Sequence, residues 1–275
     1  MNTSYFKNPF ERFVLPALEN IPLVGIYAKT RGWTFVIAWM HRIAGVLVAL
    51  YAMVHIYTLS LLAAPNEYNA KMKIFGFFIF ALLEWLLAIP VIFHALNGGR
   101  LILYEIFGSR NNGAMVRWVF GLSIIYVLLY ALLMIMGNQF VSPVFFWLII
   151  FIFSLCLVVL VTSKIWSSAG AAAWKLQRIS GVFLLIMIPA HLLFMHLQPS
   201  AGHEASVVIN RLQSIFIKLV DITLVVAVLF HAGYGLISIS KDYITSRILQ
   251  TGLSLLIVFS LVVFGWIGVK IAIIV

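Results

Sequence analysis

Four histidines stand at duplicated positions in apolar stretches of this 275-residue chain. His94 and His231 each lie between a phenylalanine and an alanine, with a glycine four residues later, and 137 positions separate them. His55 and His191 lie 136 positions apart, each thirteen residues after the arginine of an R-I-x-G-V motif. Because both patterns recur at nearly the same offset, we predict that the chain is an internal duplication with equivalent histidines in its two copies.

An ionisable side chain inside a membrane-spanning helix is energetically costly and marks a functional site. Any one of these histidines alone would more often be a packed residue that is hydrogen-bonded to a neighbour, but four at duplicated positions favour a shared role. Neutral imidazole suits iron, and two axial imidazoles give a low-spin haem that transfers electrons. We therefore predict one b-type haem between His94 and His231 and a second between His55 and His191. The sequence has no C-x-x-C-H motif, which excludes covalent c-type attachment.

The elements that must position these histidines are membrane-spanning helices. The chain is 64% hydrophobic and only 9% charged, and its repeated apolar runs have the length of about 20 residues that crosses a bilayer. We predict an all-α, polytopic membrane helical bundle of about seven spans, at residues 33–64, 73–98, 116–137, 143–165, 176–197, 214–240 and 248–274.

The duplication divides the chain into two parallel three-helix repeats joined by one extra span. Two copies of three spans can share one orientation only if a further crossing joins them, so we expect the span 143–165 to have a purely topological role. The predicted domains are an N-terminal segment, a first repeat, a linker span and a second repeat, at residues 1–32, 33–138, 139–173 and 174–275.

The basic residues set the orientation of the bundle. With the N-terminus inside, 13 of the 18 lysines and arginines fall on the inner side, as the positive-inside rule requires. We therefore predict a multi-pass protein of the bacterial cytoplasmic (inner) membrane, with a cytoplasmic N-terminus and an outer C-terminus. The net charge of +10 is interpreted as topogenic, and nucleic acid is not predicted as a partner.

This topology assigns a depth to each histidine pair. His94 and His231 come near the inner ends of helices that run inward, so we expect them to share an inner haem. His55 lies thirteen residues beyond Arg42, about 20 Å deeper at 1.5 Å per residue, and His191 lies equally deep. We expect these two to share an outer haem.

Several residues beside the inner pair have two interpretations. A side chain at Gly98 or Gly235, one turn after an inner histidine, would collide with a porphyrin lying on the helix, but such glycines also serve close helix packing. His41, Arg42 and Arg178 lie at the inner boundary, where they would either bind haem propionates or anchor the interface.

The remaining acidic and histidine residues that we consider in the apolar stretches are Glu84, Asp221 and His196. Glu84 and Asp221 lie toward the outer half, where they would handle protons or bind a quinol, or else stay protonated and satisfied by a neighbouring helix. His196, near the outer end of the fifth span, and His203, in the polar loop after it, are interpreted as residues that do not bind haem.

Two motifs resemble the cytochrome b membrane anchor of succinate dehydrogenase and fumarate reductase, which form respiratory complex II. The run His41-Arg42-Ile43-Ala44-Gly45 is similar to the H-R-x-S-G motif of the larger anchor subunit, in which His94 falls at the haem ligand. His231-Ala232-x-x-Gly235, followed by Asp242 and Tyr243, is similar to the smaller anchor subunit. The chain thus resembles the two anchor subunits fused into one dihaem chain, from residue 33 onward.

The resemblance implies two haem b groups, with ligands at His94 and His231 and at His55 and His191. It also implies a quinone, either menaquinone or ubiquinone. The family's inner quinone pocket uses a serine, an arginine and an Asp-Tyr pair, and Arg42, Asp242 and Tyr243 match it, whereas the serine position holds Ala38. Relatives that use an outer quinone site make Glu84 a candidate there.

The same resemblance implies flavoprotein and iron–sulfur subunits bound on the cytoplasmic side. Succinate or fumarate chemistry would occur on the flavoprotein, so we assign no catalytic residue and no dicarboxylate chemistry to this chain. It would pass electrons between the iron–sulfur subunit and membrane quinone. The physiological direction, and assembly into a higher oligomer, stay open.

Two alternatives share part of this pattern. A dihaem quinol-oxidising cytochrome b of another membrane reductase would carry the same four histidines. A transporter built from parallel repeats would use them as a proton relay and would be colourless. Pro90 and Pro189 do not stand at equivalent positions, which disfavours the paired broken helices of a transport site.

Overall fold

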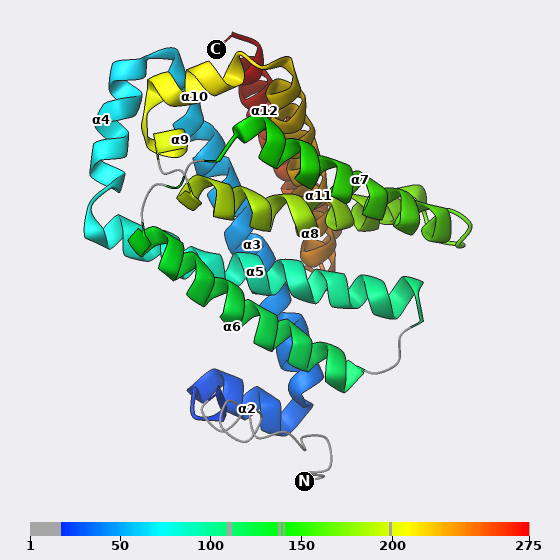
Figure 1. Cartoon of the computed structure of the whole chain (residues 1–275). Helices are drawn as coiled ribbons and strands as arrows, with labels where there is room; N and C mark the ends of the chain where they lie inside the picture. Colours follow the sequence, from blue (N-terminus) through cyan, green and yellow to red (C-terminus); the bar gives the residue numbers. More distant parts are fainter. Residues whose placement is uncertain (1–17, 109–111, 137–138, 140, 198–199, 275) are drawn as a thin grey trace.

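Seven long helices form the body of the protein (Figure 1). The computed structural model describes residues 18–108, 112–136, 139, 141–197 and 200–274, and over these ranges the secondary structure is entirely helical. All seven helices are long and apolar enough to cross a membrane, which confirms the predicted all-α, polytopic architecture. They are α3 (Trp33–Ser60), α5 (Phe78–Ile106), α6 (Asn112–Met136), α7 (Pro143–Ile165), α8 (Ala172–Leu197), α11 (Ile215–Tyr243) and α12 (Arg247–Ile274).

The four helices that carry the candidate histidines form a closed ring. Helix α3 packs on α5, α5 on α8, α8 on α11, and α11 on α3. Helices α6 and α12 cover α5 and α11 respectively, and α7 packs on α8. Helices α3 and α5 come from the first predicted copy, and α8 and α11 come from the second. Two of the four contacts in the ring therefore lie within one copy, and the other two join the copies.

The two copies also agree in detail. Helices α5 and α11 each contain 29 residues, and each is preceded by an extended residue and begins with an aromatic or aliphatic side chain. His94 and His231 occupy the same place in these two helices, sixteen residues after Phe78 and Ile215. The duplication therefore fixes the histidine positions along the helices as well as in the sequence.

Within the described ranges, the structure gives five short helices outside this body. Helix α2 (Pro22–Arg31) begins with a proline at its first turn and packs on α3, and the turn η2 (Leu61–Ala63) continues the end of α3. The other three, α4 (Pro65–Phe75), α9 (Ser200–His203) and α10 (Ala205–Leu212), gather at one end of the molecule (Figure 1). Helix α2 and the C-terminal end of α12 lie at opposite ends, as an odd number of crossings requires.

The second predicted span was placed wrongly at both ends. Predicted at 73–98, it is divided at its start, because α4 ends at Phe75 and α5 begins only at Phe78. At its other end the helix continues through Asn97-Gly98-Gly99 to Ile106. Gly99 allows a neighbouring helix to approach closely and does not mark a helix end, since a Cβ there would lie 3.0 Å from the Leu185 side chain.

The segment between the predicted fifth and sixth spans, which we interpreted as a polar loop, is also partly helical. Ala205, Val208 and Leu212 recur at helical spacing and are all buried, so α10 packs one apolar face onto the bundle. The Tyr68 hydroxyl of α4 donates a hydrogen bond to the main-chain oxygen of Gly202 on α9, which directly precedes α10. Burial raises the pKa of Tyr68, so the phenol remains a donor.

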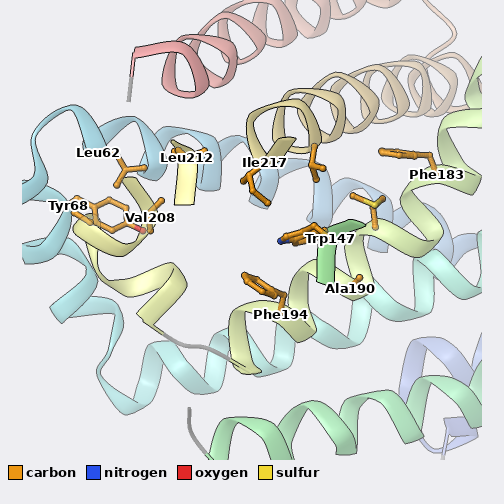
Figure 2. Close-up of a cluster of buried hydrophobic side chains, with 12 residues drawn as sticks. Leu62, Tyr68, Trp147, Phe183, Ala190, Phe194, Val208, Leu212 and Ile217 are labelled. Carbon is orange, nitrogen blue, oxygen red and sulfur yellow. The ribbon is translucent and has the colours of Figure 1, made fainter. Parts of the chain in front are cut away.

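Helix α7 does more than connect the two copies. Trp147 is 2% exposed and lies in the largest cluster of buried apolar side chains, between α8, α10 and α11 (Figure 2). The hydroxyl of Ser154 donates a 3.2 Å hydrogen bond to the Phe183 oxygen on α8. The prediction of a purely topological role for 143–165 is therefore wrong, because this span supplies part of the core around the second copy.

Two further differences concern the edges of the predicted segments. Helix α11 continues to Tyr243, three residues beyond the predicted end of the sixth span at residue 240. Residues 1–17 of the predicted N-terminal segment and Arg110 of the basic loop after the second span lie outside the described residues.

Candidate functional site

The structure brings His94 and His231 together in the middle of the helical ring. Their ring centroids are 6.1 Å apart and the ring planes meet at 88°. His94 comes from α5 and His231 from α11, and both side chains are partly buried. The two helices extend twelve residues past these histidines, about 18 Å at the α-helical rise. The predicted span limits put this pair close to the inner helix ends, and that prediction is wrong, because both helices continue well past the histidines.

The hydrogen bonds of the inner pair repeat the duplication. Nδ1 of His94 lies 3.0 Å from the main-chain oxygen of His41, and Nδ1 of His231 lies 3.3 Å from that of Gln177. Positions 41 and 177 are equivalent at the offset of 136. A carbonyl oxygen only accepts, so each Nδ1 carries the proton and each Nε2 keeps its lone pair. Metal-binding histidines are oriented in this way by a backbone carbonyl.

A pair of glycines backs the inner histidines, and the sequence-based site assignment missed their role. A Cβ on Gly45 would lie 2.8 Å from Cε1 of His94, and one on Gly181 would lie 3.2 Å from Cε1 of His231. Both are the glycines of the R-I-x-G-V motifs on α3 and α8. The glycine in the repeated motif was therefore the signal that could have identified these two positions. Glycine has no Cβ, so a histidine ring can come this close to it.

Gly98 and Gly235, which we predicted beside the inner pair, face His41 and Gln177. A Cβ on Gly98 would lie 3.8 Å from Cε1 of His41, and one on Gly235 would lie 3.8 Å from Nε2 of Gln177. These are ordinary van der Waals distances, so the two glycines face the residues that hold the histidines.

His41 packs directly on the inner pair. Its ring stacks on that of His94, with centroids 4.0 Å apart and planes within 1°. Within the described residues, the buried Nδ1 of His41 has no hydrogen-bond partner. In the second copy the place of this ring is taken by Gln177, whose Nε2 lies 3.5 Å from Nε2 of His231. The surroundings of the two inner histidines thus differ by one aromatic ring.

His55 and His191 form the second pair. Their ring centroids are 6.0 Å apart and their planes meet at 81°. Tyr51 stacks beside His55 with a centroid distance of 5.7 Å, and Trp147 of α7 lies 6.1 Å from His191. The buried Nδ1 of His191 has no hydrogen-bond partner among the described residues. Along α3, this pair is separated from the level of His41 by fourteen residues, about 21 Å.

The donor sets of both pairs fit an iron held between two imidazoles. With a metal–nitrogen distance of about 2 Å on each side, two imidazole rings on one metal have centroids about 6 Å apart. The observed separations of 6.1 and 6.0 Å match this value. In the part of the chain that the structure describes, no three His, Cys, Asp or Glu side chains converge as a metal site, so the donors occur only as pairs.

Arg42, Asp242 and Tyr243 also come together, at the end of the bundle that carries the inner boundary residues. The Arg42 guanidinium donates to Asp242 Oδ2 at 2.7 Å and to the Tyr243 hydroxyl at 3.0 Å. Arg42 and Tyr243 line an open groove of about 210 Å³ with Trp39, Ile43, Val46, Leu47 and Ile239. The groove combines apolar walls with hydrogen-bonding groups at one side, which suits a small amphiphilic ring.

Arg178 takes part in an equivalent contact that the sequence reasoning did not include. Its Nε donates a hydrogen bond to Oε2 of Glu105 at 2.9 Å and its Nη2 donates to Oε1 at 3.2 Å. Its guanidinium also lies over the Trp174 ring, 5.0 Å from the centroid. Glu105 precedes Asp242 by 137 positions, so the offset of the inner histidines would have pointed to it.

The remaining predicted residues divide into one cluster and two separate positions. Glu84, His196 and Tyr130 form a cluster on α5, α8 and α6, in which the Tyr130 hydroxyl lies 2.9 Å and Glu84 Oε1 3.7 Å from Nε2 of His196. Asp221, the counterpart of Glu84, lies on α11 outside this cluster, and His203 is exposed at the end of α9.

Comparison with known proteins identifies two matching stretches in the chain. Residues 23–135 and 160–269 match the model of the succinate dehydrogenase/fumarate reductase transmembrane subunit family, which together is well over half of the chain. A curated relative, the succinate dehydrogenase 2 membrane subunit SdhC of Mycobacterium tuberculosis (strain ATCC 25618 / H37Rv), is 35% identical over 88 residues. This alignment covers 30% of the present chain and 64% of the relative, so the chain spans less than two thirds of that protein. No solved structure gives a significant match. The chain belongs to the succinate dehydrogenase/fumarate reductase transmembrane subunit family.

Proposed function

We propose that this chain is the dihaem cytochrome b membrane anchor of a succinate:quinone oxidoreductase. The observation that carries the proposal is the pairing of four histidines from four different helices at 6.1 and 6.0 Å. Each pair takes one histidine from each of the two stretches that match the family. A b-type haem with two imidazole ligands supplies reversible one-electron transfer.

The chain's own residues would hold and orient these groups. The main-chain oxygens of His41 and Gln177 fix the tautomers of His94 and His231, so that both present Nε2 as the ligand. Gly45 and Gly181 let α3 and α8 approach the two rings. His55 and His191 would be the ligands of the outer group, between Tyr51 and Trp147.

The groove at Arg42, Asp242 and Tyr243 is the proposed inner quinone site. A quinone carbonyl accepts hydrogen bonds and a quinol hydroxyl donates them, and this cluster offers a guanidinium, a carboxylate and a phenol. The apolar walls of the groove suit the quinone ring. Glu84 is the proposed candidate for an outer quinone site. Menaquinone or ubiquinone would serve as the quinone.

The domain boundaries and the orientation belong to the same proposal. The first repeat would cover 33–138, the linker span 139–173 and the second repeat 174–275, with the N-terminus and residues 1–32 in the cytoplasm. The family match in two separate stretches, 23–135 and 160–269, supports a division into two repeats, and its second stretch begins within the proposed linker span. A flavoprotein subunit and an iron–sulfur subunit would bind on the cytoplasmic side, where they would carry out the succinate or fumarate chemistry.

Purification of a tagged chain from its native membrane would test the proposal and separate it from the two alternatives. The proposal predicts a red complex that contains flavin and iron–sulfur clusters and that reduces quinone with succinate or fumarate with quinol. A red preparation with haem but neither partner would favour a cytochrome of another reductase. A folded but colourless preparation, from cells supplied with haem, would contradict both cytochrome functions and favour the transporter.

A further inference from the structure

An open hollow of about 650 Å³ lies between α4 and the α9–α10 segment, at the end of the molecule opposite α2 (Figure 1). Its volume is within the range of roughly 300–1,000 Å³ that is typical of small-ligand pockets. In the described part of the chain, its lining includes none of the residues proposed for haem or quinone. The polar side chains of the lining come from both walls: Asn66, Asn69 and Lys73 on α4, and His203, Glu204 and Ser206 on the other side.

The two walls are equivalent segments of the duplication. Asn66 and His203 stand 137 positions apart, as do Asn69 and Ser206. Oδ1 of Asn69 also accepts a 2.9 Å hydrogen bond from the main-chain nitrogen of Ala205, which stands 136 positions later. Equivalent residues can line one hollow only where the relation between the copies brings their segments face to face. The hollow therefore lies at the junction of the two copies.

Buried residues hold both walls in place. Tyr68 on α4 and Val208 on α10 belong to the cluster of buried apolar side chains in Figure 2. The Tyr68 hydroxyl and the main-chain nitrogen of Ala205 each donate a hydrogen bond across the junction, to Gly202 and to Asn69. The orientation of the Asn69 amide is thereby fixed, and its NH2 group can donate to a ligand. A hollow formed in advance binds a ligand at a lower entropic cost.

Lys73 and Glu204 place opposite charges on the two walls without forming a pair. Among the described residues, neither side chain takes part in an ion pair, so their charged atoms are more than 4.0 Å apart. Their counterparts at the offset of 137, Asn210 and Glu67, do not line the hollow. The hollow thus has one positive and one negative side, although its walls are equivalent. A ligand with an anionic and a cationic group would satisfy both charges.

The lining suits a phosphate ester joined to a primary ammonium group. Lys73 and the NH2 group of Asn69 lie one turn apart on α4, where both can donate to phosphate oxygens. The Glu204 carboxylate can accept hydrogen bonds from an ammonium group. Ala70 and Met72 add apolar surface for the CH2 groups between the two charges. The described lining contains no Phe, Tyr or Trp, the residues that recognise a quaternary ammonium group.

The surface next to Lys73 suits the acyl chains of a lipid. Ile74 follows Lys73 directly, and Phe77 and Phe78 stand where the span of α5 begins. All three apolar side chains are exposed, at the boundary where a membrane-spanning helix enters the hydrocarbon region. A lysine at such a boundary extends its ammonium group toward the lipid headgroups. The phosphate in the hollow can therefore belong to a phospholipid whose chains lie along this surface.

We propose that the hollow between α4 and the α9–α10 segment binds the phosphoethanolamine headgroup of a phospholipid. Lys73 and Asn69 bind the phosphate and Glu204 binds the ammonium group, so one lipid joins the two copies at this end of the bundle. A phosphoglycerol headgroup has no ammonium group for Glu204, and a choline headgroup has no N–H to donate. The site goes beyond the proposed function and does not depend on haem or quinone.

Native mass spectrometry of the assembled, delipidated complex in detergent tests this site, with dioctanoyl phosphatidylethanolamine as the probe. We expect one saturable site, and roughly tenfold weaker binding of the corresponding phosphatidylcholine and phosphatidylglycerol. Glu204→Gln should weaken the binding of phosphatidylethanolamine about tenfold, the effect of one lost charged hydrogen bond, and remove its preference over phosphatidylcholine. Lys73→Gln should weaken both lipids alike, because both carry the phosphate.

The matched controls are Lys71→Gln and Glu67→Gln. Lys71 is a second lysine of α4, Glu67 is the counterpart of Glu204, and neither lines the hollow. Both variants should keep the affinity for phosphatidylethanolamine within about twofold of the original chain. Lys73→Arg, which keeps the charge, should bind like the original chain. All these side chains are exposed, and thermal unfolding without lipid verifies that each variant folds.

Equal affinity for the three lipids would overturn the proposal, as would unchanged binding of phosphatidylethanolamine in both Lys73→Gln and Glu204→Gln. Glycerophosphoethanolamine, which carries the same headgroup without acyl chains, separates a lipid from a soluble ligand. We expect it to bind roughly tenfold more weakly than the lipid, because the acyl chains no longer contribute. Equally tight binding of the soluble ester would overturn the lipid as the ligand of the hollow.

Discussion

Arg42 of the first copy binds Asp242 of the second at 2.7 Å, across the interface between the two halves of the molecule. The reverse contact, between Arg178 of the second copy and Glu105 of the first, has a nearest distance of 2.8 Å. The two ion pairs are therefore the same contact with the copies exchanged. They differ in that Arg42 also binds the Tyr243 hydroxyl and lines a groove, whereas Arg178 is covered by Trp174.

Because only Arg42 lines a groove, we predict that only the ion pair of Arg42 with Asp242 takes part in quinone binding. Asp242→Asn should raise the KM for quinone about tenfold, because it removes one charged partner of the headgroup. Its side chain is 47% exposed, so the loss of folding stability should be below about 1 kcal/mol. Steady-state kinetics of the assembled complex, together with thermal unfolding, measure the two effects.

Glu105→Gln is the matched control for this experiment, since it breaks the equivalent ion pair. It should reduce stability at least as much, because its side chains are less exposed, and leave the quinone KM unchanged. Equal effects of both changes on the KM would show that the groove at Arg42 is not the inner quinone site.

The contact between Gly45 and His94 predicts a local effect of one added methyl group. Gly45→Ala should push the His94 ring, because the new Cβ would lie 2.8 Å from Cε1. We expect a loss of about 1–3 kcal/mol of stability, as for other overpacked sites, and a changed absorption spectrum of the inner haem. Gly181→Ala should act in the same way but more weakly, since its Cβ would lie 3.2 Å from His231.

Gly121→Ala provides the control, because a Cβ there meets nothing within 4 Å. In the interior of α6 it should leave the spectrum unchanged and stabilise the protein by about 0.5–1 kcal/mol. An unchanged spectrum in Gly45→Ala, with the full complement of haem, would contradict the close packing of α3 on the inner pair.

Trp147 predicts that α7 supports the outer pair. Trp147→Ala should destabilise the protein by about 3–5 kcal/mol, as expected for a large buried aromatic side chain, and should weaken haem retention at His55 and His191. Trp118→Ala is the comparison, since Trp118 is 68% exposed on α6 and should cost little. Detergent-solubilised protein can be followed by thermal unfolding and by absorbance of the outer haem. Similar losses in both variants would indicate that Trp147 has no special place beside His191.

The sequence predicted the elements whose signals lie within one helix or in the repeat. Seven spans followed from apolar length, and the partners of His94 and His55 followed from offsets of 137 and 136 residues. Helix limits were less predictable, because Gly98 and Gly99 resemble a helix end in sequence but face the side chains of neighbouring helices in the structure.

Contacts that depend on packing between helices could not be predicted from local patterns. Trp147 looked like one more apolar residue of a connecting span, and its position beside His191 depends on how α7 packs on α8. His196 was interpreted as a residue without a ligand role, and only the structure shows Tyr130 and Glu84 beside it. Glu105, in contrast, could have been predicted from the sequence repeat, because it stands 137 positions before Asp242.

The number of b haems per chain tests the central claim most directly. A pyridine haemochrome assay on the purified protein should give two haems per chain. Replacement of His94 or His231 by glutamine should leave one haem, as should replacement of His55 or His191, whereas His203→Gln should keep both. One haem in the original chain, lost only with the inner pair, would contradict the outer haem site. No haem, in a folded preparation from cells supplied with haem, would contradict the assignment of all four histidines.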